Sequence, residues 1–205
     1  MALAVIDKNN KKISEIVLSD GAAEKVNKAV LYYIVKANRN NLRHGTASVK
    51  DRSEINKTTK KLYRQKGTGN ARHGARKSNI FVGGASTHGP RPRSYFEKVN
   101  KKLKMKGYQE AFKYLIQNDH LKVLNELNFD KPNTQEAGKT LGKLNLRKAL
   151  VVLTKDNTNA RLSFRNLKDV KVISDENINV YDMLRYENVV VTAESFEKIK
   201  ERYTL

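Results

Sequence analysis

The apolar positions of this chain fall into short runs near its two ends, with a long stretch between them that lacks any periodic pattern. The first two runs, 3–6 and 13–18, flank a polar turn at 8–11. Short apolar segments on either side of a polar turn are typical of paired strands. The pattern therefore predicts a small β-hairpin at the start of the chain.

A helix is predicted next, over about residues 22–38. Val26, Val30, Tyr33 and Ala37 are spaced so that they share one face of a 3.6-residue repeat. Asp20 precedes this segment and is expected to act as the N-cap, since its carboxylate can accept hydrogen bonds from the first free amides of a helix.

Periodic order resumes near residue 100. Tyr108, Ala111, Phe112 and Leu115 mark a helical face. Four runs rich in Val, Leu and Ile then predict buried strands, at 121–124, 149–153, 170–173 and 189–191. Helical segments are expected between and after them, at 134–144, 159–167, 178–186 and 194–202. Such alternation predicts a three-layer α/β/α domain around a mostly parallel sheet of about four strands.

The stretch between the two ends predicts a long irregular loop. Its few apolar side chains follow neither the two-residue period of a strand nor the 3.6-residue period of a helix. Seven of the eleven glycines lie between Gly45 and Gly89. It buries too little to offset the entropy of ordering it. We therefore expect a single α/β body built from residues 1–42 and 97–205, with residues 43–96 as an extended loop inserted after the first helix.

Positive charge is concentrated in this loop. The chain carries a net charge of +20, and residues 39–104 hold 18 Lys or Arg side chains against three acids, a net charge of +15. A segment this basic repels itself unless a polyanion neutralises it, which indicates nucleic acid as the partner. Tyr63, Phe81, Tyr95 and Phe96 are candidates to stack on unpaired bases, and His73 could contact a phosphate or a base.

Composition excludes several other classes of function. The chain has no cysteine, so thiol catalysis, disulfides and cysteine-bound metals are excluded. Its four histidines show no metal-ligand spacing, and we expect no metal, no cofactor and no catalytic residues. The longest apolar runs are too short to cross a bilayer, and no signal peptide is visible. A soluble, cytoplasmic protein is expected.

Two alternatives remain open on these grounds. The first is an RNA-modifying or nucleotide-using α/β enzyme with a basic RNA-binding loop. It would need a ligand site at the carboxyl ends of the strands, yet Gly138-Lys139-Thr140 has Asn133 where a phosphate-binding loop needs its first glycine. Gly138 is expected in a surface turn instead. The second is a polybasic binder of anionic membranes, which would need an apolar anchoring face.

Specific motifs in the loop resemble one known family. Arg64-Gln65-Lys66-Gly67-Thr68-Gly69 with Ala71-Arg72, then Gly89-Pro90 with Pro92-Arg93, and Lys98-Val99 with Lys101-Lys102, are similar to the bacterial form of the large-subunit ribosomal protein L4 family. Tyr186 to Thr192 adds a C-terminal match. The family's usual Trp before Arg64 is Tyr63 here, and Phe81 stands where the family has a second Trp.

The resemblance implies a structural constituent of the large ribosomal subunit, not an enzyme. It implies a globular α/β body with a loop threaded into large-subunit rRNA, which supports assembly. It also places the loop tip, Gln65, Lys66, Gly67, Thr68 and Gly69, at the wall of the peptide exit tunnel. The partners would be the rRNA, neighbouring large-subunit proteins including the L22 family, and the nascent peptide. No membrane and no homo-oligomer are expected.

The candidate RNA-binding residues follow from the loop's chemistry together with this resemblance. Cationic side chains are expected to neutralise phosphates, with arginine able to do so through two parallel hydrogen bonds. The full set is Lys57, Lys60, Lys61, Tyr63, Arg64, Lys66, Arg72, His73, Arg76, Lys77, Phe81, Arg91 and Arg93.

Overall fold

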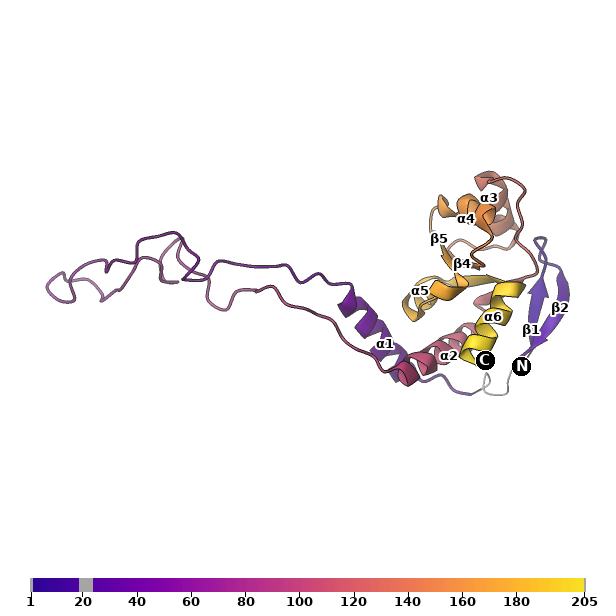
Figure 1. Ribbon diagram of the computed structural model, residues 1–205, viewed down its shortest axis with the longest axis horizontal. Helices are drawn as coiled ribbons and strands as arrows, with labels where there is room; N and C mark the ends of the chain where they lie inside the picture. The colour runs from indigo at the N-terminus through magenta and orange to yellow at the C-terminus, as the bar shows by residue number, and fades with distance from the viewer. Residues whose placement is uncertain (1, 19–23, 205) are drawn as a thin grey trace. The chain divides into compact units, whose positions relative to one another are not determined.

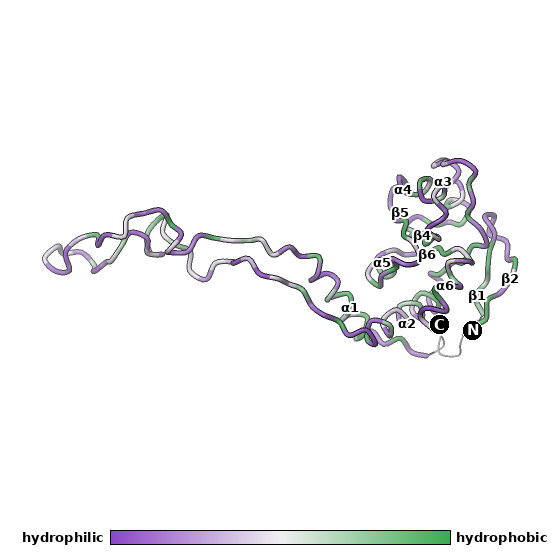
Figure 2. Tube along the Cα trace, viewed as in Figure 1, coloured by the Kyte–Doolittle hydropathy of each residue, from purple (hydrophilic) through white to green (hydrophobic). Residues whose placement is uncertain are grey.

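Two units make up the computed structural model, which describes residues 2–18 and 24–204 (Figure 1). Residues up to 39 together with those from 97 onward form one unit, here called the body, and residues 40–96 form the other, here called the basic loop. In Figure 2 hydrophobic residues gather on the strands of the body, whereas the basic loop is largely hydrophilic. No helix among the described residues has the length and apolarity to cross a bilayer.

The body contains a six-stranded, mostly parallel sheet. In chain order its strands are β1 (Ala2–Ile6), β2 (Lys12–Val17), β3 (Leu121–Leu124), β4 (Ala149–Leu153), β5 (Val170–Ser174) and β6 (Asn188–Thr192). The order across the sheet is β2-β1-β3-β6-β4-β5. Only the β1–β2 pair is antiparallel. The expected number of about four strands was too low, because the predicted hairpin joins the sheet by pairing Val5 with Val123 and Ile6 with Leu124.

Six α-helices lie in the described part of the chain. They are α1 (Lys28–Asn41), α2 (Lys101–Gln117), α3 (Thr134–Lys143), α4 (Thr158–Arg165), α5 (Val180–Arg185) and α6 (Ala193–Tyr203). The helices predicted after residue 100 are confirmed. The predicted first helix is confirmed from Lys28 onward, where Asn27 Oδ1 accepts from the amides of Ala29 and Val30 at 3.2 and 3.3 Å. The expected cap, Asp20, lies outside the described residues.

The core has two halves, one on each face of the sheet. Side chains of a strand alternate between faces, and both faces of β4 are buried. Leu150 and Val152 pack with residues of α1, α2, α5 and α6, whereas Ala149, Val151 and Leu153 pack with α3 and α4. The sheet is therefore the middle of three layers, as the alternating pattern predicted.

A contact between the side chain of Ile34 in α1 and the backbone of Gly107 in α2 joins these two helices. A Cβ atom added to Gly107 of α2 would overlap the terminal methyl group of Ile34 of α1, so a larger residue there requires the Ile34 side chain to move. The buried face of α1 is formed by Leu31, Ile34 and Ala37. Tyr33, which the predicted periodicity placed on that face, is 38% exposed. The prediction was wrong by one or two positions, because apolar residues at 30, 31, 33, 34 and 35 fit more than one stripe.

A buried carboxylate fixes the start of α1 on α2. Glu110 is only 5% exposed, and its Oε2 accepts from the amide of Asn27 at 2.6 Å. Its other oxygen lies 3.6 Å from Lys113 Nζ. Burial of a carboxylate is tolerated when it is paired and hydrogen-bonded in this way.

On the other face of the sheet, Gly138 lies inside α3 and not in a surface turn as expected.

A pair of glycine substitutions separates packing from helix propensity. Gly107→Ala should lower the free energy of unfolding by about 1–3 kcal/mol, because the new methyl group must displace Ile34. Gly142→Ala, in the last turn of α3, should raise it by up to about 1 kcal/mol, since no atom lies within 4 Å of the added Cβ and alanine favours helix. Urea unfolding followed by circular dichroism measures both. A stabilising Gly107→Ala would contradict the close packing of α1 on α2.

Candidate nucleic-acid interface

The basic loop is an irregular hairpin whose two arms run antiparallel (Figure 1). Backbone hydrogen bonds cross between the arms at three levels: Arg93 N to Gly45 O at 3.1 Å, Val49 N to Pro90 O at 3.2 Å, and Leu62 N to Gly74 O at 3.0 Å. The one β-bridge in residues 42–96 joins Lys61 to Ala75. These pairs are placed nearly symmetrically about Thr68, so the tip of the hairpin is the predicted Gln65–Gly69 segment.

An arginine side chain bridges the turn at the tip, and the tip residues are exposed to solvent. Arg64 Nη2 donates to Gly67 O at 2.9 Å. Gly67 has φ +81°, a left-handed conformation that a side chain would strain. All five tip residues are exposed. The turn thus presents its backbone and the side chains of Gln65, Lys66 and Thr68 without a covering segment in the described chain.

Three of the predicted aromatic contacts form a small cluster that bridges the arms. The ring of His73 lies edge-on to Tyr63 at 6.3 Å and to Phe81 at 5.0 Å between centroids. The hydroxyl of Tyr63 donates to Ala71 O. All three rings are half-buried, so they stabilise the loop and still keep accessible surface. Residues far apart in sequence are brought together here, which no periodicity could have indicated.

The predicted cationic side chains divide into two groups. Four have partners within the loop: Lys57 donates to Val82 O at 3.1 Å, Lys61 to Gln65 Oε1 at 2.5 Å, Arg64 to Gly67 O, and Arg91 forms an ion pair with Asp51. No hydrogen bond or ion pair within the described chain engages the side chains of Lys60, Lys66, Arg72, Arg76 and Lys77. Only Arg91 meets a carboxylate, so the other charges remain uncompensated.

Arg93 belongs instead to a cation–π group at the base of the loop. Its guanidinium lies 4.5 Å from the centre of the Tyr95 ring, and that of Arg43 lies 3.8 Å from it. Arg93 hydrogen-bonds to the Tyr95 hydroxyl, and the two positive charges favour the phenolate, so the pKa of Tyr95 is below its ordinary value. Arg43 was not among the predicted site residues, because no motif links it to Tyr95; pairing of Gly45 with Arg93 brings it there.

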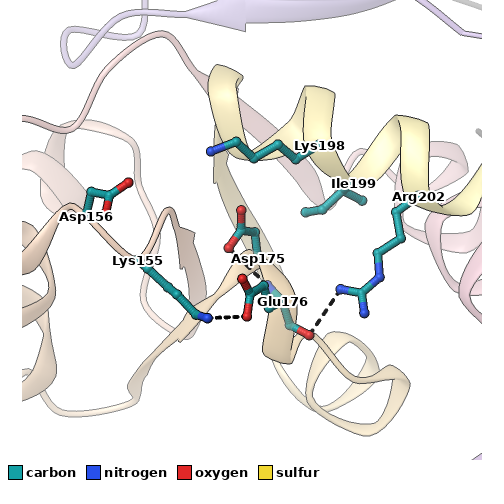
Figure 3. A pocket seen from close by; sticks show the side chains of 7 residues that line it. All are labelled: Lys155, Asp156, Asp175, Glu176, Lys198, Ile199 and Arg202. Atoms are coloured by element: carbon teal, nitrogen blue, oxygen red, sulfur yellow. Dashed lines mark hydrogen bonds and ion pairs between the residues drawn. The ribbon is translucent and has the colours of Figure 1, made fainter.

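The body has a cavity of its own, at the carboxyl ends of β4 and β5 beside α6. This cavity of about 370 Å³ is lined by three cations and three carboxylates. Figure 3 shows Lys155 reaching Glu176 in an ion pair and Arg202 Nη1 reaching the Glu176 carbonyl oxygen, at 3.3 Å. The hydrogen bond from Lys155 lowers the pKa of Glu176, and the one to Glu194 raises the pKa of Lys198.

These charges satisfy one another and leave no excess positive charge for a phosphate. The position is the one at which open α/β sheets bind nucleotides. Asp156 and Asp175 add negative charge to it, however, and it has none of the glycine-rich backbone that holds phosphates. The geometry of this cavity gives no support to the nucleotide-using alternative.

Comparison with known proteins shows to which protein family the chain belongs. The model of the ribosomal protein L4/L1 family matches residues 16–202. The chain belongs to the ribosomal protein L4/L1 family. It is 38% identical to the large ribosomal subunit protein uL4 of Desulforapulum autotrophicum over 99% of both chains, and 40% identical to that of Cytophaga hutchinsonii over 98% of both. The protein of the same name from Halothermothrix orenii is 37% identical over 97% of both chains.

Membership in the L4/L1 family confirms the resemblance drawn from the loop motifs. It also confirms the prediction of a large-subunit ribosomal protein that is not an enzyme. The match spans both units, since residues 16–202 include the whole basic loop and most of the body. The individual RNA contacts predicted in the loop remain predictions.

The cation–π group gives a titration that can be measured directly. Replacing Arg93 by Gln should raise the pKa of Tyr95, because the largest cause of its lowering is the hydrogen bond from Arg93; Arg43→Gln should raise it less. NMR of ¹³C-labelled tyrosine against pH, assigned with Tyr95→Phe, measures the change. Tyr108 is the internal control, since burial raises its pKa to about 12. An unchanged Tyr95 titration in Arg93→Gln would contradict the contact.

Proposed function

We propose that this chain binds large-subunit rRNA through the basic loop, supports assembly of the subunit, and places the loop tip at the wall of the peptide exit tunnel. Membership in the L4/L1 family supports a place in the large ribosomal subunit. The positive charge of the loop supports RNA as its binding partner. In this proposal residues 1–42 and 97–205 fold as one domain, and residues 43–96 are the rRNA-binding segment. The mechanism is electrostatic and structural, without a chemical step.

The observation that carries the proposal is the uncompensated charge. Residues 40–96 contain 13 Lys or Arg side chains and two acids, Asp51 and Glu54. Asp51 is already paired with Arg91, and a Glu54 oxygen accepts from the Asp51 amide at 2.9 Å. About ten positive charges of the loop are therefore not neutralised by acids of the loop, and closely spaced phosphates of a nucleic acid could neutralise them. Release of counterions from RNA supplies the favourable free energy of such binding.

RNA shape, and not a fixed reading surface, is the proposed source of specificity. The loop has no helix to insert into a groove, and A-form RNA has a major groove too narrow for side chains to read. The half-buried rings of Tyr63, His73 and Phe81 offer stacking surfaces for unpaired bases. An irregular hairpin of this kind fits where rRNA folds around it, which is why assembly and binding are coupled in the proposal.

The tip is proposed to line the exit tunnel beside a protein of the L22 family and to touch the nascent peptide. Support comes from the family and from the geometry of the turn: Gln65–Gly69 is exposed throughout, and Arg64 holds its backbone in a compact turn. The segment also carries no large apolar side chain on which a passing peptide could be retained.

Salt dependence tests the electrostatic mechanism. Lys60, Lys66, Arg72 and Arg76, which have no partner within the described chain, are replaced together by Gln. The slope of log K against log salt for binding to a large-subunit rRNA fragment should become shallower by about three, since each lost phosphate contact contributes about 0.7–0.9. The wild-type affinity should fall on the order of 10³–10⁵ between 50 and 200 mM salt. Filter binding measures both.

Four exposed cations of the body provide the matched control. Lys131, Lys139, Arg165 and Lys168, replaced together by Gln, change the net charge by the same amount. This variant should keep a slope much closer to that of the wild type. Equal slopes for the loop and body variants would show that total charge, and not the loop, drives binding.

Cross-linking tests the position of the tip. A photo-activatable phenylalanine derivative in place of Thr68, in ribosomes that carry a stalled nascent peptide, should give adducts with that peptide. The same group in place of Thr134, exposed on the body, should give none. Adducts of the Thr68 variant with rRNA alone would remove the proposed contact with the nascent peptide and leave the RNA-binding proposal intact.

A further inference from the structure

The basic loop contains an open surface cavity of about 670 Å³ that neither the aromatic cluster nor the tip uses. It is lined by residues 51–53, 59, 77–79 and 85–87. Backbone hydrogen bonds hold these segments together, from Ala85 N to Lys77 O at 3.1 Å and from Ser86 N to Lys50 O at 3.5 Å. The cavity is thus formed by the fold of the loop itself.

A glycine keeps one wall in place. The amide of Gly84 donates to Phe81 O at 2.8 Å, and a Cβ atom at this position would overlap the carbonyl oxygen of Ser78. Backbone that approaches this closely leaves no room for any side chain. The turn from 78 to 84 is therefore tight, and it positions Asn79 opposite Thr87, where Asn79 Nδ2 donates to Thr87 Oγ1 at 2.5 Å.

The groups lining the cavity are hydroxyls, one amide and two free cations. The hydroxyls of Ser53, Thr59 and Ser86 make no hydrogen bond within the described chain, so each can donate and accept. Arg52 and Lys77 supply positive charge, and neither meets a carboxylate. The one carboxylate in the wall, Asp51, is offset by its ion pair with Arg91.

This chemistry selects one part of a nucleotide. A phosphate needs cations and donors, which Arg52, Lys77 and the hydroxyls provide. A ribose 2′-hydroxyl needs a donor and an acceptor together, which is what free Ser and Thr side chains offer. None of the residues lining the cavity is aromatic, so nothing there stacks on a base. The match is to the sugar–phosphate backbone and not to the base.

We infer that this cavity binds a ribose–phosphate unit of the RNA backbone and distinguishes RNA from DNA through the 2′-hydroxyl. The inference rests on the proposed RNA-binding function and deepens it by assigning the sugar a role. Charge elsewhere in the loop attracts any polynucleotide, whereas this site favours those with a 2′-hydroxyl.

Matched oligonucleotides and variants of the full chain test it. The probes are a twelve-residue oligouridylate, its 2′-deoxy counterpart and its 2′-O-methyl counterpart, which keeps a ribose-like sugar pucker but lacks the hydroxyl donor. The wild type should bind the oligouridylate about tenfold more tightly than either analogue at equal salt, as expected for one or two lost hydrogen bonds. Thr59→Val with Ser86→Ala should abolish this preference without changing the salt slope, because no charge is altered.

The control is Thr46→Val with Ser48→Ala, the same two changes at exposed positions of the loop outside the cavity. It should keep the preference for RNA. Tight, salt-sensitive binding of all three probes with equal affinity would overturn the inference and leave the proposed function standing. Absence of binding to every probe would overturn the inference as well, whereas the proposed function is decided separately by binding to the large-subunit rRNA fragment. Loss of the preference in the control pair would place recognition of the 2′-hydroxyl elsewhere and overturn the assignment to this cavity.

Discussion

Repulsion among the cations of the basic loop is the constraint on which the rest of its structure depends. Each pair of unit charges 4 Å apart costs about 1 kcal/mol in water, and salt screens pairs beyond about 8 Å under physiological conditions. The loop therefore avoids a compact core and spreads its charges along two arms. Its few internal contacts, the Arg91–Asp51 ion pair and the rings around His73, occur where charge is offset or absent.

The body meets the opposite requirement, since it must bury both faces of its sheet without help from the loop. Strand β4 shows how: all five of its side chains are buried, and they alternate between the two halves of the core. Each half is closed by its own helices. The chain thus separates apolar burial, which makes a stable domain, from the positive charge that we propose to bind RNA.

The strands and helices after residue 100 could be predicted because doubly buried strands form continuous apolar runs that differ from amphipathic helices. Pairing of Val5 with Val123 could not be predicted, because nothing local relates residues so far apart. The face of α1 was misassigned because its apolar residues fit two stripes, and the sequence alone does not indicate that Leu31, Ile34 and Ala37 form the buried one. In the loop, composition indicated the partner, whereas the neighbours of His73 and Tyr95 arise from pairing between the arms.

Near-symmetry of the two arms about Thr68 restricts how the length of this segment can change. Pairs such as Gly45 with Arg93 and Leu62 with Gly74 stay opposite one another only while each arm keeps its length, 16 residues in 46–61 and 18 residues in 75–92. An insertion or deletion in one arm would shift every pair between it and the tip out of alignment, including the residues around the surface cavity. Length changes between homologues are therefore expected at the turn itself, or as compensating changes in both arms.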